Sequence, residues 1–373
     1  MLVETTTHKK KIGVAIAGLG FGEKVHLEAV KNNPGFELIS LWHHQKERVE
    51  KTCKEHNLKV HKDWEDLLNN KNIDAIIIAT PPKPRYWLAK QALIKGKHLL
   101  LEKPVTLTVE EAKQLQKISI TNKLSVAVDF EYRAVPLFLQ LKNILEKNII
   151  GDPWLIKVDW LMSGRANKER PWNWYSDDSQ GGGVLGALGT HAFDILHWLI
   201  GPTKNISASF STAIKQRKEM LSNKKLNVTS DDIALLHLDL QSNQYNSTVP
   251  AQLTLSAVTK NGRGFWIEIY GSKGTLILGS DNQNDYVHGF GLWCSINNEP
   301  LKRIPTEGKY AFTKTWTDGR VAPVGRIQEW WRESIVNSYP IIPGIAEGVA
   351  SQEVCDKARY SHESSQRQNT SFF

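Results

Sequence analysis

The chain has 373 residues, of which 40% are hydrophobic, and a formal net charge of +8. This length allows two domains, and no run approaches the roughly 18 apolar residues that a membrane-spanning helix needs. Apart from Lys9–Lys11 and Lys215–Lys225, the basic residues are dispersed and form no stripe of the kind that binds nucleic acid. We therefore expect no membrane and no nucleic-acid partner, and we interpret the charge as attracting anionic cofactors or substrates.

Cysteine usage and the first residues indicate a reducing compartment. Cys53, Cys294 and Cys355 are far apart and odd in number, which disfavours a disulfide framework and a zinc site. The stretch Met1–Lys11 is polar and basic and lacks the apolar core of a secretory signal. A cytoplasmic protein is the simplest expectation.

The first expected element is an apolar strand, Ile12–Ala17, which leads into a glycine cluster and a helical segment, Glu23–Asn32. A helix N-terminus that faces such a turn carries free N–H groups and a partial positive charge, so it suits a pyrophosphate. The residues expected there are Gly18, Gly20, Phe21 and Gly22. The third glycine comes one place earlier than in G-x-G-x-x-G, and a tight turn without a ligand is the alternative interpretation.

Strand and helix patterns alternate up to about residue 130. Further strands are expected at Glu37–Trp42, Ile73–Ala79, His98–Leu101 and Leu124–Val128. Further helices are expected at Lys46–His56, Arg85–Lys95 and Val109–Thr121. This alternation, with nearly continuous apolar runs, predicts a doubly wound parallel α/β sheet in residues 1–130.

The end of the second strand bears on the type of dinucleotide. An acidic residue about 20 positions beyond the glycines would bind a ribose hydroxyl. This chain instead reads Trp42-His43-His44-Gln45-Lys46, without a carboxylate. His43, His44 and Lys46, with Arg48, could meet a 2′-phosphate, so the pattern slightly favours NADP over NAD.

Two motifs follow the third and fourth strands. Thr80-Pro81-Pro82 follows Ile73–Ala79, and Glu102-Lys103-Pro104 follows His98–Leu101. Because the carboxyl ends of parallel strands meet at one edge of the sheet, both motifs should share the edge with the glycine turn. The prolines would stiffen a loop along the cofactor, and Lys103 could exchange a proton there. A simple turn and a surface lysine are the alternatives.

From about residue 150 strands follow one another without intervening helices. After a strand at Trp154–Met162 and a helix at His191–Ile200, strands are expected at Asn205–Ile214, Asp232–Leu240, Ala251–Val258, Phe265–Tyr270 and Thr275–Leu278. Residues 280–323 fit no element and are expected to form long loops. Two helices, Arg326–Asn337 and Glu347–Ser364, close the chain. The pattern predicts a second domain, residues 131–373, with an antiparallel or mixed sheet.

A second group of chemically useful residues lies in this half. Gly181–Gly183 is followed by His191 and Asp194, which are three apart and would share one helical face. Asp194 could therefore orient His191 for proton transfer, or the pair could be buried for packing. His197 extends the series, but further metal ligands are lacking, so no metal site is expected. Arg165 and Trp172, in the preceding polar loop, could line a sugar pocket or serve domain packing.

Together these residues resemble the glucose–fructose oxidoreductase, inositol dehydrogenase and MocA-like family. The matches, in order, are the glycine turn, Ala79-Thr80-Pro81-Pro82, Gly96-Lys97-His98 leading to Glu102-Lys103-Pro104, and Gly181–Gly183 with Gly189-x-His191-x-x-Asp194. The resemblance implies a Rossmann domain followed by an α+β domain, whose large open sheet often forms a dimer or tetramer interface. It also implies a nicotinamide cofactor and a sugar- or polyol-like substrate.

The resemblance assigns roles to particular residues. Lys103 matches the family's active-site lysine, with a cis peptide bond to Pro104, and His191 matches its proton-transferring histidine. One position departs from the pattern, because Ala187 stands where the family commonly has an aspartate. Glu131 and Asp194 are candidates to replace that carboxylate. We expect an NAD(P)-dependent oxidoreductase acting on CH–OH groups; a nucleotide-binding sensor without turnover and an anion-binding module are the alternatives.

Overall fold

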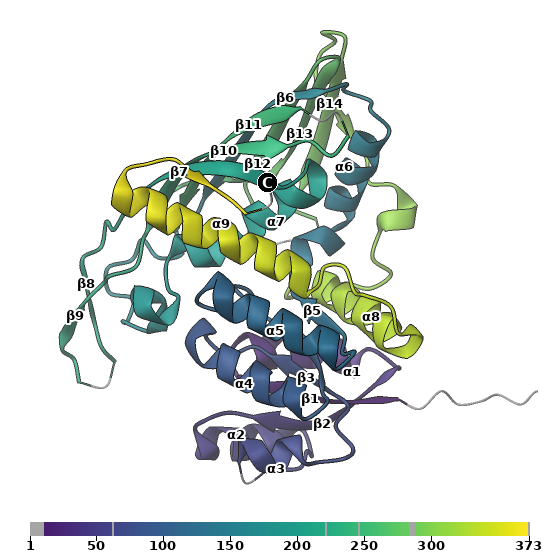
Figure 1. The fold of residues 1–373 in the computed structure, drawn as a ribbon, viewed down its shortest axis with the longest axis vertical. Coiled ribbons are helices and arrows are strands. Elements are labelled where there is room, and N and C mark those ends of the chain that lie inside the picture. The colour runs from purple at the N-terminus through teal and green to yellow at the C-terminus, as the bar shows by residue number, and fades with distance from the viewer. Residues whose placement is uncertain (1–10, 62, 221, 245–246, 283–287, 372–373) are drawn as a thin grey trace, which may run out of the picture.

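The computed structural model describes residues 11–61, 63–220, 222–244, 247–282 and 288–371 (Figure 1). Most of the polar start Met1–Lys11 therefore lies outside the described residues. Figure 1 shows a small sheet with its helices at one end of the molecule and a large sheet at the other. The last long helix runs between them.

The small sheet is parallel throughout, as the apolar runs predict. Its strand order is β2-β1-β3-β4-β5, and every neighbouring pair is parallel. The strands are β1 (Ile12–Ala17), β2 (Phe36–Trp42), β3 (Ala75–Ile78), β4 (His98–Leu101) and β5 (Val126–Val128). The residues of β1 and β3 are all buried, which is expected where helices cover both faces.

Helices connect these strands near the predicted positions. They are α1 (Leu27–Lys31), α2 (Lys46–Glu55), α3 (Trp64–Leu68), α4 (Pro82–Ile94) and α5 (Val109–Thr121). Helix α4 begins three residues earlier than predicted, because a proline is well suited to the first helical turn. The five-residue helix α3 was not predicted, since it is too short to show a helical period.

The large sheet has nine strands in the order β15-β14-β13-β12-β6-β11-β10-β7-β16. Only the pair β6–β11 is parallel. Its strands are β6 (Pro153–Leu161), β7 (Thr203–Ser211), β10 (Ile233–Gln241), β11 (Thr248–Ser256), β12 (Gly264–Gly271), β13 (Gly274–Ser280), β14 (Gly291–Ile296), β15 (Lys302–Ile304) and β16 (Gln368–Asn369). The predicted mostly antiparallel α+β domain is confirmed.

The expectation that residues 280–323 form long loops is wrong in part, and a short hairpin was not predicted. Within residues 280–323, β14 and β15 extend the sheet beside β13. The stretch Lys215–Lys225 contributes to a hairpin of β8 (Gln216–Lys218) and β9 (Lys225–Asn227). These strands are short or half-exposed and show little periodicity, so pairing with the neighbouring strand stabilises them.

One face of the large sheet packs on α6 (Pro136–Glu146), α7 (Thr190–Leu199) and the last helix. Along β10, buried residues such as Leu236 alternate with exposed ones such as Leu235 and His237. The other face of the sheet is therefore open.

The chain returns to the first domain at its end. Helix α8 (Val321–Asn337) places Ile327 and Trp331 in the core of the parallel sheet. Helix α9 (Ile345–Ser364) packs Val349 against Val109 and Ala112 of α5. Helices α8 and α9, which follow the large sheet in sequence, therefore pack against the first domain.

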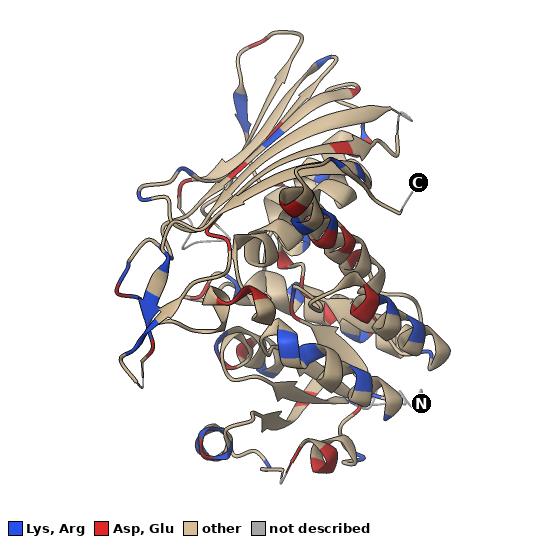
Figure 2. Ribbon diagram, turned by 60° about the vertical axis from the view of Figure 1, so that its left-hand side comes forward, with Lys and Arg blue, Asp and Glu red and all other residues tan. Residues whose placement is uncertain are grey.

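The basic residues are dispersed over the fold, as the sequence indicates. Figure 2 shows Lys and Arg interspersed with Asp and Glu over the helices. Among the described residues, no helix is long and apolar enough to cross a bilayer.

Candidate active site

The three glycines that follow β1 have different surroundings. Gly18 has a φ of +106°, and a Cβ built on it would lie 2.5 Å from the carbonyl oxygen of Ala79. A Cβ on Gly22 would lie 3.0 Å from Ile16 Cγ2. On Gly20 it would meet no atom of the described residues within 4 Å. Gly18 and Gly22 are therefore needed for close packing, whereas Gly20 leaves the backbone open to a bound group.

The early third glycine has a structural explanation. The segment η1 (Gly22–His26) is π-helical, and the Leu27 N–H donates to the Gly22 carbonyl before α1 continues the helix. A π-helical turn is wider than an α-helical one, and here Gly22 itself makes the close contact with the strand. Glu23, in the usual third-glycine position, instead faces Arg48 at 4.0 Å. Arg48 also donates to the Leu19 carbonyl at 2.6 Å.

A buried arginine that the sequence analysis missed ties two loops of this edge together. The guanidinium of Arg85, on α4, donates to the carbonyl oxygens of Thr80, Glu102 and Pro104. Arg85 is only 3% exposed, and burial lowers its pKa to about 10, so it stays charged. The Thr80 hydroxyl beside it is buried and has no hydrogen-bond partner among the described residues. The Thr80 hydroxyl is therefore an unsatisfied polar group at this edge of the sheet.

Lys103 lies where β4 ends and reaches across to the second domain. Its peptide bond to Pro104 is cis. Its Nζ donates to the carbonyl oxygen of Ala187, 2.9 Å away. The backbone of position 187 therefore orients the ammonium group, although Ala187 offers no carboxylate.

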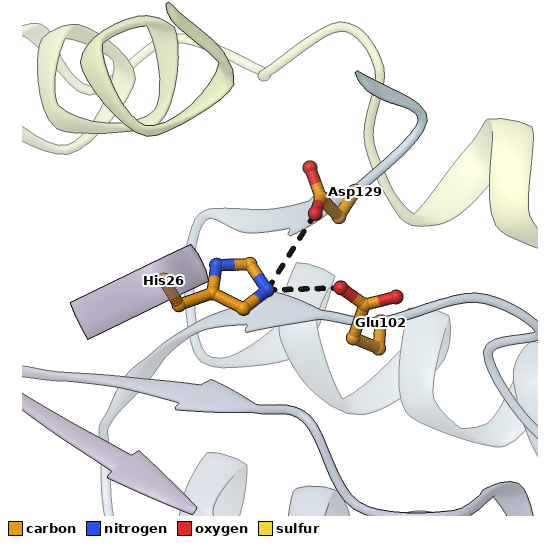
Figure 3. Close-up of side chains that lie close together, drawn as sticks. All are labelled: His26, Glu102 and Asp129. Atoms are coloured by element: carbon orange, nitrogen blue, oxygen red, sulfur yellow. Dashed lines mark hydrogen bonds and ion pairs between the residues drawn. The ribbon is translucent and has the colours of Figure 1, made fainter. Parts of the chain in front are cut away.

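Behind Lys103, three buried side chains form a second feature that the sequence analysis missed. Figure 3 shows His26 facing Glu102 and Asp129, with Nε2 2.9 Å from Glu102 Oε1 and 3.5 Å from Asp129 Oδ2. Gln328 Nε2 lies 3.2 Å from His26 Nδ1 and can only donate to it. The ring proton therefore sits on Nε2 and is donated to Glu102.

The pKa values of the two carboxyl groups in this cluster are shifted in opposite directions. Burial would raise the pKa of Glu102, but the hydrogen bond from His26 and the charges of Lys103 and Arg85 lower it below its usual value. Burial and the neighbouring carboxylates raise the pKa of Asp129 well above its usual value. The three ligand atoms lie within 4.8 Å of one another and could hold a metal ion. Because hydrogen bonds join Gln328 to His26 and His26 to Glu102, we interpret the cluster as a hydrogen-bonded network.

His191 lies at the start of α7 and faces a carboxyl group, but not the predicted one. Its Nε2 is 3.5 Å from Oε2 of Glu131, which begins η2 (Glu131–Ala134) directly after β5. His191 and Glu131 are 3% and 6% exposed. Burial, and then the charge of Lys103, lower the pKa of His191 well below its usual value. The imidazole is thus neutral at physiological pH.

The predicted role of Asp194 in orienting His191 is wrong. Both oxygens of Asp194 accept hydrogen bonds from Arg133, at 2.7 and 2.8 Å. Helical spacing places the two residues on one face, yet a buried guanidinium from η2 takes up the whole carboxylate. Although burial raises the pKa of Asp194 to about 6, the charge and hydrogen bonds of Arg133 favour its ionised form. Asp194 therefore joins α7 to η2.

The two residues of the loop that was expected to bind substrate, Arg165 and Trp172, lie in different surroundings. Arg165 stacks over Tyr175, with its guanidinium carbon 3.8 Å from the ring centroid, and Tyr175 contacts the triple glycine through its carbonyl. Trp172 is turned toward the β8–β9 hairpin, where its Nε1 donates to the Asn227 carbonyl. No hydrogen bond from either side chain to Lys103 or His191 occurs among the described residues.

The basic residues after β2 also differ in their suitability for a phosphate. Burial, and then the charges of His44 and Arg48, lower the pKa of His43 to about 4, so His43 is neutral near pH 7. His44 is exposed, and its ring centroid lies 4.2 Å from that of His43. Lys46 is 68% exposed and lies 3.8 Å from Glu50. Lys46 and Arg48 are therefore the better candidates for contact with a phosphate at this position.

The residues present fit a dinucleotide. An open backbone at Gly20, an unpartnered Thr80 hydroxyl and a fixed Lys103 lie along one edge of a parallel sheet, where such folds bind nucleotides. This combination defines a nucleotide-binding Rossmann domain joined to an α+β domain. Residues 12–130 match the model of the oxidoreductase family with an NAD-binding Rossmann fold, and residues 142–369 match the C-terminal alpha/beta domain of that family. The chain belongs to this family of Gfo/Idh/MocA oxidoreductases.

Individual relatives and structures agree with this assignment. An uncharacterized oxidoreductase of Synechocystis is 40% identical over 359 residues, which cover 96% of this chain and 95% of the relative. A glucose-6-phosphate 3-dehydrogenase of Bacillus subtilis is 24% identical over 354 residues, which cover 93% of this chain and 95% of the relative. A levoglucosan dehydrogenase in complex with NADH and levoglucosan has the same fold, with a TM-score of 0.84 at 19% identity, covering 98% of this chain and all (100%) of that chain.

Proposed function

We propose that this protein transfers a hydride between a nicotinamide cofactor and a hydroxyl- or carbonyl-bearing carbon of a sugar, a polyol or a related compound. The observation that carries the proposal is the position of Lys103. It follows β4 on the edge shared with the glycine turn, and it is held by Ala187 of the second domain. Its charge also acts on both Glu131 and His191.

Lys103 and the residues around it would have separate roles in the reaction. When bound, the nicotinamide supplies the hydride chemistry. The ammonium group of Lys103 polarises the substrate oxygen, and the neutral imidazole of His191 accepts the hydroxyl proton during oxidation. Gly18, Gly20, Phe21, Gly22 and the loop Thr80–Pro82, with Glu102 behind Lys103, would hold the cofactor.

NADP is the slightly favoured cofactor. Support comes from the absence of a carboxylate at the end of β2 and from the cations Lys46 and Arg48, whereas a neutral His43 contributes only hydrogen bonding. Arg165 and Trp172 are proposed to line the substrate site, the open sheet to form a homodimer or homotetramer, and the cytoplasm to be the location. Sugar dehydrogenases among the relatives support the substrate class.

The proposal predicts nucleotide binding and turnover that depend on two residues. Calorimetry with NAD⁺, NADP⁺ and their reduced forms should show binding, and absorbance of the reduced nicotinamide should report oxidation of levoglucosan, glucose 6-phosphate or another member of a polyol and aldose panel. Lys103→Met and His191→Ala should each lower kcat by about 100-fold or more, as expected when an electrostatic or acid–base group is removed.

The alternatives give different outcomes. Nucleotide binding without oxidation of any panel member would favour the sensor without turnover, which the alanine at position 187 suggests. No nucleotide binding at millimolar concentration would favour an anion-binding module. Full turnover by both variants would refute the mechanism.

A further inference from the structure

The pair Glu131–His191 lies at the junction of the two domains and is closed off from water. Aromatic rings surround the imidazole: the ring centroids of Tyr132, Phe130 and Trp160 lie 5.0, 6.0 and 6.1 Å from that of His191. Among these rings, Nε2 of His191 lies 3.5 Å from Oε2 of Glu131. Nδ1 is buried without a hydrogen-bond partner among the described residues. One side of the imidazole thus faces a carboxyl group, while the other has an unused polar atom.

The charged groups that act on Glu131 come from the end of β4 and from the segment before α8. Lys103, after β4, and Arg320, just before α8, favour its ionised form, whereas Glu102 disfavours it. The pKa of the Asp129 carboxyl, two residues away, is raised well above its usual value by burial and by the charges of Glu102 and Glu131. Asp194 is taken up by Arg133 and does not serve His191. Glu131 is therefore the carboxyl group that remains for proton exchange with the imidazole.

The balance of these effects places Glu131 close to half-ionised at neutral pH. Burial raises its pKa, the charge of Lys103 opposes this, and the net result is a pKa of about 7. The imidazole beside it stays neutral because burial and Lys103 lower its pKa. A proton delivered to the pair therefore ends on the carboxylate.

We propose that Glu131 is the final acceptor of the substrate's hydroxyl proton, which reaches it through His191. This inference rests on the function proposed above. During oxidation the hydroxyl proton moves to one ring nitrogen of His191, and the proton of the other nitrogen moves to Glu131. The electron pair of the C–H bond leaves with the hydride that the nicotinamide accepts, so a carbonyl and a neutral Glu131 result. In reduction the same protons return.

A first experiment measures the carboxyl group directly, without turnover. In NMR titrations of protein labelled at the glutamate carboxyl carbons, one signal should titrate near pH 7 and should be absent in Glu131→Gln. His191→Asn should shift that titration. No glutamate signal titrating between about pH 6 and 8, or one that persists in Glu131→Gln, would overturn the inference.

A second experiment links the pair to the cofactor. When NAD⁺ or NADP⁺ binds near pH 7, its positive nicotinamide should favour ionised Glu131, so calorimetry in buffers of different ionisation enthalpy should detect proton release. Glu131→Gln should bind without that release. Glu146→Gln, a matched change at a side chain that is 58% exposed on α6, should behave as the wild type. Equal release by all three proteins would contradict the proposal, whereas no binding by the wild type would refute the proposed function itself.

Turnover provides the third measurement, with any member of the panel that is oxidised. The wild-type kcat for oxidation should rise with pH, because Glu131 must be ionised to accept the proton, and the midpoint should lie below the value of about 7 for the free protein, because the bound cationic nicotinamide favours ionised Glu131. Glu131→Gln should lose that rise and about 100-fold in kcat, and Glu131→Asp should recover most of the rate with the pH dependence restored. A pure packing role would change stability and leave the pH profile unchanged, which would also overturn the inference.

Discussion

At the scale of single residues, the edge of the parallel sheet is unusual for how many ionisable groups it buries. Glu102, Arg85 and His26 are 8%, 3% and 0% exposed, and each has a hydrogen-bonded partner. Buried charges are costly unless they are paired and hydrogen-bonded, so such a set adds little net stability. Its physical effect is to fix the backbone on both sides of Lys103.

Glu131 should make stability depend on pH. Its pKa rises from 4.5 when unfolded to about 7 when folded. The stability contribution of the neutral form is complete below pH 4.5 and is lost as the pH rises through 7, a change of roughly 3 kcal/mol. Glu131→Gln, which cannot ionise, should therefore gain stability relative to the wild type at pH 8 and much less at pH 5. Denaturant unfolding at both pH values tests this, and an equal difference at the two would contradict it.

At the scale of an element, the glycines of the turn between β1 and η1 have two different roles, close packing and cofactor binding. Gly18 and Gly22 touch neighbouring atoms closely, whereas Gly20 faces open space. The same residue type thus serves two purposes within five positions. Sequence spacing alone cannot separate them, because all three read simply as glycine.

Two alanine substitutions should distinguish these purposes. Gly20→Ala should change the free energy of unfolding by less than about 1 kcal/mol, since its Cβ meets nothing, yet weaken nucleotide binding at least tenfold. Gly18→Ala should destabilise the protein by several kcal/mol, on the order of 3, because of its positive φ and the contact with Ala79. Thermal unfolding and calorimetry measure the two effects. Normal nucleotide affinity in folded Gly20→Ala would mean that the turn does not bind the cofactor.

At the scale of the whole molecule, no helix of the described residues packs on the open face of the large sheet. Trp266 and Trp293 stack there, with ring centroids 5.7 Å apart and an angle of 23° between the ring planes. Leu235 on β10 is 48% exposed on the same face. A broad sheet face that carries aromatic and aliphatic groups is suited to association with a second copy.

The proposed dimer or tetramer should depend on that face. Leu235→Lys should shift the mass measured by light scattering toward the monomer while the melting temperature of the isolated chain changes little. Met220→Lys is the matched control, because Met220 is 76% exposed beside the β8–β9 hairpin and lies off the large sheet. A monomeric wild type, or an unchanged mass in Leu235→Lys, would show that this face is not the interface.

Local sequence determined much of this architecture. The bounds of β1, β4 and α5 agree with the predictions, because continuous apolar runs and helical periodicity are properties of neighbouring residues. The positions of the glycine turn and Lys103 on one edge also followed, since parallel strands must end together. The strands β14 and β15 were missed because both are short and only partly buried, and what defines them is the pairing of β14 with β13 and of β15 with β14.

Only the tertiary structure decided which side chains meet in the site. Arg133 and Asp194 are 61 positions apart, and their contact displaces the predicted pairing of Asp194 with His191. Arg85 reads as an ordinary helical arginine until three carbonyl oxygens are seen to surround it. Glu131 and His191 meet because the end of β5 packs against α7. Periodicity specifies which face of an element is buried, but the partners on that face depend on how distant segments pack, which no local pattern contains.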